Sequence, residues 1–217
     1  MIKIEDLHFK YPEDDFSLKI NNFEMNDAES IALIGASGSG KSTFMKILSG
    51  EIIPLKGRIT VLDQDLTALG DSQKRHLRLN SIGMVLQDSA LLDYLSLLDN
   101  ITLPLTLLNK KFDKEWLNTI TKNCGTSELL KKKPEHVSEG EKQRAAVCRA
   151  LLNKPGILLA DEPTSSLDKK NSLAVTELLI KQCKENNTNL IMITHDESQL
   201  NFFDRVVNLE ELNEAKS

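Results

Sequence analysis

The sequence predicts an α/β fold with a mostly parallel sheet, an N-terminal antiparallel β part and an inserted α-helical subdomain. Short apolar runs at 30–34, 157–160 and 189–194 have the composition of buried parallel strands. Alternating apolar and polar residues near the N-terminus indicate strands with one solvated side. From Ser89 to Asn153 helical spacing replaces the strand pattern over about 60 residues, the size of a small subdomain.

The first apolar strand leads into a glycine-rich loop and then a helix. The loop reads Gly35-Ala36-Ser37-Gly38-Ser39-Gly40-Lys41-Ser42-Thr43, which is a P-loop. Its glycines allow successive N–H groups to point inward, which forms an anion cradle at a helix N-terminus. Lys41 is placed to reach the β- and γ-phosphates, and the Ser42 hydroxyl to ligate Mg²⁺. The motif therefore predicts a nucleoside triphosphate site.

Composition narrows the class of protein. The chain has 217 residues, 40% hydrophobic and 27% charged, as expected of one globular domain. Its net charge of −5 argues against nucleic acid as the main partner. No apolar run approaches the roughly 18 residues of a membrane span, and no signal peptide is expected from the first residues. Three widely spaced cysteines lack a Cys-x-x-Cys pattern, which suggests a reducing cytosol, no disulfide framework and no metal ligation by the cysteines.

Two strands are expected before the P-loop strand. Alternation over residues 2–9, with one break in register, predicts the first, and alternation over residues 16–20 predicts an antiparallel partner. Tyr11 lies between them. Its ring is either a platform for adenine or the cap of a strand end, and the sequence leaves both interpretations open.

A further strand ends at a candidate ligand. Short strands are expected at Arg58–Leu62 and Ile82–Leu86, with a polar helix at Asp71–Leu79 between them. Gln87 follows the second strand, and polar residues at the carboxyl ends of parallel strands are well placed for ligand contact. Gln87 is therefore a candidate to ligate Mg²⁺ or hold a water, and a strand-capping amide is the alternative.

The inserted region ends in a long helix that begins near Ser138 and runs to Leu151 or Leu152. Ser138 and Glu141 form the Ser-x-x-Glu of a capping box. The free N–H groups and positive dipole end of such a helix start also suit a phosphate brought in from outside.

Two carboxylates follow the apolar run Ile157–Ala160. Asp161 is expected to hold Mg²⁺ together with Ser42, and Glu162 to accept a proton from the attacking water. The next buried strand, Asn189–Thr194, is followed directly by His195. Its place at a strand end equivalent to that of Asp161 favours contact with the γ-phosphate.

The remaining elements are a helix, a short strand and the tail. Asp168 is placed to cap a helix that continues to about Cys183. Arg205–Leu209 is expected to be a last strand, and the polar tail after Glu210 is expected to fray.

Together these motifs resemble the nucleotide-binding subunit of ABC transporters over nearly the whole chain. Tyr11 resembles the aromatic residue of the A-loop, and Gly35–Thr43 resembles the Walker A motif. Gln87 resembles the Q-loop glutamine, and Ser138–Glu141 resembles the signature motif. Ile157–Glu162 resembles the Walker B motif, Ser165–Asp168 resembles the D-loop, and His195 resembles the switch histidine. The stretches 65–82 and 91–104 are similar to the bacterial lipoprotein-releasing, macrolide-export and cell-division group (LolD, MacB and FtsE types).

The resemblance implies a P-loop NTPase (RecA-like) core at about 1–88 and 154–217, with the helical subdomain at about 89–153, in a single domain. It implies an ATPase that uses ATP and Mg²⁺, pairs head-to-tail with a second copy of itself around two ATP, and drives separate integral-membrane permease subunits. The location would then be cytoplasmic, on the inner face of the cell membrane. An exporter or lipoprotein-releasing subunit is favoured; a cell-division-type signalling ATPase and a soluble non-transport ABC protein are the alternatives.

The resemblance also implies roles for the site residues. Nucleotide binding is expected of Tyr11, Gly35, Ala36, Ser37, Gly38, Ser39, Gly40, Lys41, Ser42 and Thr43, and of Ser138, Gly140 and Glu141 from the other copy. Ser42, Gln87 and Asp161 are expected to hold the metal, and Glu162, His195 and Gln87 to be catalytic.

One departure from the family pattern lies in the signature, which usually reads Leu-Ser-Gly-Gly-Gln. Here Glu139 replaces the first glycine. A carboxylate aimed at the nucleotide would face like charge at about 4 Å, at a cost of one to a few kcal/mol. We expect Glu139 to point to solvent, where the helix dipole favours it.

Overall fold

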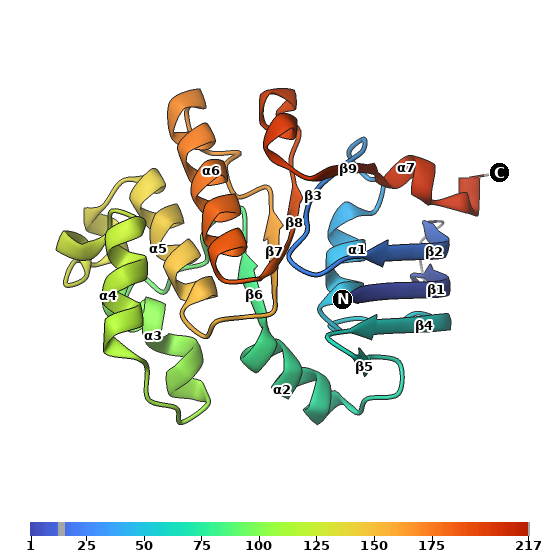
Figure 1. Cartoon of the computed structure of the whole chain (residues 1–217), viewed down its shortest axis with the longest axis horizontal. Helices are drawn as coiled ribbons and strands as arrows, with labels where there is room; N and C mark the ends of the chain where they lie inside the picture. The colour runs from blue at the N-terminus through green and yellow to red at the C-terminus, as the bar shows by residue number, and fades with distance from the viewer. Residues whose placement is uncertain (13–15, 217) are drawn as a thin grey trace.

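The computed structural model describes residues 1–12 and 16–216, which form two sheets and the helices around them (Figure 1). The parallel sheet has the strand order β6 (Ile82–Val85), β7 (Ile157–Asp161), β8 (Asn189–Ile193), β3 (Ser30–Ile34) and β9 (Arg205–Asn208). The antiparallel sheet has the order β2 (Ser17–Met25), β1 (Ile2–Lys10), β4 (Lys56–Val61) and β5 (Gln64–Asp65). The predicted mostly parallel sheet and antiparallel N-terminal part are confirmed.

The α-helices are α1 (Lys41–Leu48), α2 (Asp71–Ser81), α3 (Leu97–Leu107), α4 (Lys114–Asn123), α5 (Glu139–Leu151), α6 (Lys169–Glu185) and α7 (Leu209–Leu212). Short 3₁₀ turns are η1 (Ser127–Leu129), η2 (Pro134–His136), η3 (Glu197–Phe202) and η4 (Glu214–Lys216). Every regular element that the structure describes between β6 and β7 is helical. Figure 1 shows α3, α4 and α5 gathered on the side of the parallel sheet that lies away from the antiparallel sheet.

Both faces of the parallel sheet are covered. In β7, Leu158 and Ala160 belong to a core shared with α3, α4, α5 and α6, while Ile157 and Leu159 belong to a core shared with α1 and the antiparallel sheet. Successive side chains of a strand point to opposite faces, so burial on both faces requires the continuous apolar run seen in the sequence. Helix α1 lies between the two sheets (Figure 1), where Phe44 is fully buried.

The predicted break in the first strand is a bulge. Asp6 has a left-handed φ of 50°, and the pairing of β1 with β4 shifts between Glu5 and His8. Gly57 of β4 lies opposite, also with a positive φ (99°), and a Cβ there would come within 2.6 Å of the Asp6 carbonyl oxygen. Only glycine fits at this point of close backbone approach.

The prediction that the tail frays after Glu210 is wrong for the part of it that the structure describes. Asn213 is 5% exposed and pairs with the edge strand β2: its Oδ1 accepts from the backbone N–H of Lys19 (2.9 Å), and its Nδ2 donates to the carbonyl of Ser17 (3.1 Å). A polar composition did not reveal this docking, because the partner strand lies near the other end of the chain.

Candidate functional site

The glycine-rich loop joins β3 to α1 and is held by its own backbone. Gly38 and Gly40 have φ values of 78° and 99°, in the region that favours glycine. A Cβ at Gly40 would lie 2.3 Å from a ring carbon of Phe16, so the loop also needs glycine for packing. The Lys41 amine donates to the carbonyl oxygens of Gly35 (2.8 Å) and Ala36 (2.9 Å), which places it directly over the loop.

Tyr11 follows β1 and lies beside this loop. Its hydroxyl is 3.3 Å from the Oγ1 of Thr43, and its ring packs edge-on against Phe9 with centroids 4.7 Å apart. A cavity of about 380 Å³ is bounded by Tyr11, Phe16 and residues of the P-loop. Tyr11 therefore borders the cavity beside the P-loop, and its contact with Phe9 also gives the ring a packing role.

Asp161 lies at the carboxyl end of β7, close to Ser42 and Lys41. Burial raises the pKa of Asp161, and the Ser42 hydroxyl and the charge of Lys41 only partly oppose this effect. A cation would relieve the cost of burying this carboxylate, and both side chains offer the hard oxygen ligands that Mg²⁺ prefers. The described ranges contain no cluster of three or more His, Cys, Asp or Glu suited to a metal.

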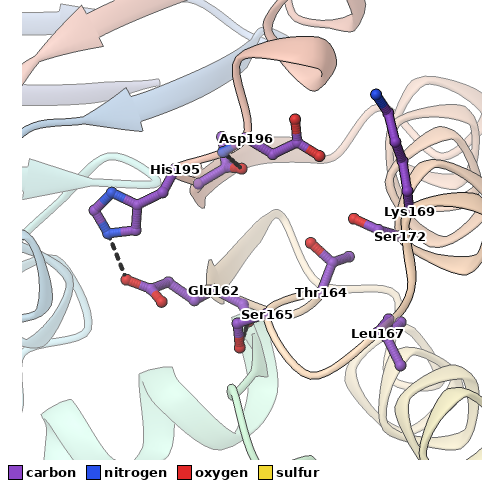
Figure 2. A pocket seen from close by; sticks show the side chains of 9 residues that line it. Glu162, Thr164, Ser165, Leu167, Lys169, Ser172, His195 and Asp196 are labelled. Carbon is purple, nitrogen blue, oxygen red and sulfur yellow. Dashed lines mark hydrogen bonds and ion pairs between the residues drawn. The ribbon is translucent and has the colours of Figure 1, made fainter.

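The next residue, Glu162, contacts His195 across the edge of the parallel sheet. The Glu162 Oε1 and the His195 Nε2 are 2.8 Å apart, and Figure 2 shows this pair at one side of a pocket of about 480 Å³. Glu162 has a left-handed φ of 44°, which is strained for a residue with a side chain. This bend turns the chain away from the strand direction immediately after Asp161.

Gln87 lies in the turn after β6, so the predicted ligands do follow three neighbouring strands, β6, β7 and β8. Its side chain is exposed and has no hydrogen bond among the described residues, so the structure does not join it to Ser42 or Asp161. The turn itself is held by α5. Arg149 donates to the carbonyls of Ala90 (2.5 Å) and Ser89 (2.7 Å), whose φ values are left-handed.

Gln143 makes a further link from α5, since its Nε2 donates to the Leu86 carbonyl at 2.9 Å. Sequence reasoning missed both Gln143 and Arg149. Nothing in their spacing distinguishes them from ordinary helical polar residues, because their partners lie more than fifty positions away.

Ser138 caps α5, and the predicted capping box is confirmed. The Glu141 Oε2 accepts from the backbone N–H (2.8 Å) and the hydroxyl (2.9 Å) of Ser138, while Ser138 Oγ accepts from the Glu141 N–H. Glu139 is 60% exposed, and its Oε1 lies 2.7 Å from the Lys142 amine on the same helix. Its carboxylate therefore faces solvent, as expected.

The signature segment and the P-loop lie apart within one chain. Figure 1 shows α5 and α1 on opposite sides of the parallel sheet, and their buried residues belong to different cores. The structure brings Ser42, Asp161, Glu162 and His195 together at one edge of the sheet, and leaves Ser138 and Gly140 elsewhere.

A glycine loop between a buried parallel strand and a helix, with an acidic residue at the carboxyl end of another strand of the same sheet, defines the class of P-loop nucleoside triphosphatases. The ABC transporter family matches residues 18–165. The chain belongs to this family, as an ATP-binding subunit that hydrolyses ATP. Among the residues described, no helix is long and apolar enough to cross a membrane.

Related proteins carry several names. The ATP-binding protein HrtA of Staphylococcus epidermidis, whose name associates it with hemin import, is 43% identical over 194 residues, 88% of this chain and 87% of that protein. The lipoprotein-releasing system ATP-binding protein LolD of Xanthomonas oryzae pv. oryzae is 38% identical over 185 residues, 84% of this chain and 76% of that protein. The resemblance to the lipoprotein-releasing group is thereby confirmed.

Solved structures agree with the fold. The dimeric ATP-binding cassette MJ0796 bound to ADP and phosphate has a TM-score of 0.84 and 28% identity, covering 96% of this chain and 94% of that one. CbiO1 of Clostridium perfringens, part of an ABC transporter complex, has a TM-score of 0.85 and 28% identity, covering 95% of this chain and 83% of that one.

Proposed function

We propose that this chain hydrolyses ATP as one half of a head-to-tail homodimer and drives a separate membrane permease of an exporter or lipoprotein-releasing system. The separation of the P-loop from the Ser138 end of α5 carries this proposal. Both segments are helix starts, whose free N–H groups suit a phosphate, yet they lie on opposite sides of one sheet. A second copy related by two-fold symmetry can bring its Ser138 to the first copy's P-loop, and the reverse, so that two equal sites form.

In the first wall of each site, the P-loop N–H groups and the Lys41 amine bind the phosphates. Ser42 and Asp161 would hold Mg²⁺, which would neutralise charge on the phosphate oxygens. Gln87 contributes a further ligand or holds a water. Glu162 accepts a proton from the attacking water, and His195, 2.8 Å away, orients this carboxylate and steadies the developing charge.

The second wall comes from α5 of the other copy. Ser138 offers its hydroxyl and the free N–H groups of the helix start, which carry the positive end of the dipole. A Cβ at Gly140 would meet its own chain only at ordinary distances, 3.6 Å from Arg144 and 3.8 Å from Leu167. The absence of a side chain there keeps the helix start open to a phosphate oxygen. Glu141 acts through its bond to Ser138, which it orients.

The permease partner is supported by the surface around the Gln87 turn. Arg149 and Gln143 join this turn to α5, so displacement of the turn carries the Ser138 end with it. Tyr94, seven positions after Gln87, is 71% exposed, and we place the permease contact at this side chain and the turn. Binding there would hold the chain at the cytoplasmic face of the membrane.

A mixing experiment tests the paired site. Lys41→Ala and Ser138→Ala proteins are each expected to have little ATPase activity alone. In a 1:1 mixture, about half of the dimers contain one copy of each variant. Each of these mixed dimers has one intact site out of two, so about a quarter of the wild-type rate should return. Single-chain catalysis predicts no recovery on mixing, and that result would overturn the proposal.

Co-purification with a multi-span membrane protein tests the partner surface. The Tyr94→Asp change should abolish it, and the exposed-site control Glu177→Gln should not.

A further inference from the structure

A fully buried amide lies beneath the loop that carries His195. Gln199 of η3 is 0% exposed, and its Oε1 accepts from the Thr194 hydroxyl at 2.9 Å. Its Nε2 lies within hydrogen-bonding distance of three oxygens: Ser172 Oγ (2.6 Å), Thr164 Oγ1 (3.3 Å) and Asp196 Oδ2 (3.3 Å). One side chain thus joins the loop after β8, the loop after Glu162 and the first turn of α6.

These partners flank the Glu162–His195 pair. Thr194 and Asp196 are the chain neighbours of His195, and Thr164 follows Glu162 by two positions. Figure 2 shows Thr164 and Ser172 on one side of the pocket and His195 with Asp196 on the other. Because Gln199 bonds to both sides of the pocket, it affects the position of His195 relative to Glu162.

The hydrogen-bond inventory makes the link specific to an amide. An amide has two N–H donors, and here three acceptors compete for them. The bond to Ser172 is short and takes one donor, so the other is shared between Thr164 and Asp196. Gln199 is itself fully buried, so loss of its amide bonds leaves polar partners unsatisfied at a cost in free energy.

We propose that Gln199 is a positioning residue that sets His195 against Glu162 by bonding the segments on both sides of the pair. This inference rests on the proposed function of Glu162 and His195. The alternative is that Gln199 contributes to folding alone. The chain offers a matched control in Gln182 of α6, a buried amide (1% exposed) that donates to Glu185 and has no bond to the site.

The test compares Gln199→Met with Gln182→Met in the full-length chain with ATP and Mg²⁺. Methionine keeps the length of glutamine and removes its polar atoms. Both changes are expected to lower the melting temperature. Only Gln199→Met should lower kcat, by about tenfold, with KM for ATP within about twofold of wild type. In a His195→Ala background, Gln199→Met should cause no further loss, because both changes disable the same pair.

A Gln199→Met rate equal to that of Gln182→Met would overturn the inference, as would an equal fold loss with and without His195. If His195→Ala alone keeps the wild-type rate, the proposed role of His195 fails, and this inference fails with it. If His195→Ala lowers the rate but Gln199→Met does not, this inference is rejected and the proposed role of His195 stands. Should Gln199→Met not fold, as judged by circular dichroism, Ser172→Ala takes its place under the same criteria, because it removes the acceptor of the shortest Gln199 bond (2.6 Å) without adding a charge.

Discussion

The Nε2 atom of His195 lies 2.8 Å from the Oε1 atom of Glu162, although the two residues follow different strands of the parallel sheet. The register of β7 and β8 pairs Asp161 with Ile193, so the two strands end at the same level of the sheet. The left-handed turn at Glu162 then brings its side chain to the histidine. Strand register and one strained residue together produce this pair.

Glu162 is the proposed base, and Glu162→Gln tests it. Glutamine keeps the shape and a hydrogen bond to His195 but takes up no proton. We expect ATP binding to persist, kcat to fall about 100-fold or more, and the dimer to accumulate on gel filtration with ATP. Glu177→Gln, at an exposed site on α6, should behave as wild type. Phosphate release at the normal rate by Glu162→Gln would rule out the base assignment.

Tyr11 has two interpretations that Tyr11→Ala separates. If the ring stacks on the base, its loss should raise KM for ATP about tenfold at nearly constant kcat, since stacking contributes about 1–3 kcal/mol. Tyr11→Phe keeps the ring and should stay close to wild type. If the ring only packs on Phe9, Tyr11→Ala should lower the melting temperature and leave KM unchanged. Steady-state kinetics and thermal melts on the three proteins decide between the two interpretations.

Glu139 replaces a glycine of the family signature, and Glu139→Gly restores it. The carboxylate pairs with Lys142 on its own helix and is exposed, so its removal should leave ATPase activity unchanged or higher. The free energy of unfolding should fall by about 1 kcal/mol or less, from the lost dipole interaction and the flexibility of glycine. Activity assays and urea melts check both numbers. A severe loss of activity would show that the carboxylate takes part in the reaction.

Asp204 supports the strand that leads into the P-loop. Its Oδ2 accepts from the N–H (2.9 Å) and hydroxyl (2.6 Å) of Ser30, and Lys184 lies 3.1 Å from its Oδ1. Burial acts to raise the pKa of Asp204, but the bonds from Ser30 and Lys184 outweigh it, and the pKa is lowered below 3.8. A lowered folded-state pKa gives stability that is present above the unfolded value and is lost as pH falls through the folded value.

Asp204→Asn should therefore melt below wild type near neutral pH, and the difference should shrink as pH falls below about 4. Thermal melts from about pH 2.5 to 7 measure it, with Asp93→Asn at an exposed site as the control. A difference that is constant across this range would mean that the charge of Asp204 contributes nothing.

Part of the structure can be predicted from residues that lie close together in the sequence. The P-loop, the capping box at Ser138 and the bulge in β1 were predicted because each depends on residues within a few positions of one another. The strands β7 and β8 were predicted because burial on two faces demands an unbroken apolar run. Gln199 was not predicted: a glutamine four positions after His195 resembles any polar surface residue until its distant partners are known.

By itself the sequence determined the identity of the elements, the chemistry available at each strand end and the class of ligand. The tertiary structure decided which of these ends meet. Strand order placed Asp161 beside the P-loop and His195 beside Glu162, Arg149 tied the Gln87 turn to α5, and Asn213 covered the edge of β2. The physical reason is that such contacts join segments far apart in the chain, and their geometry arises only when apolar burial on both faces of the sheet fixes how the segments pack.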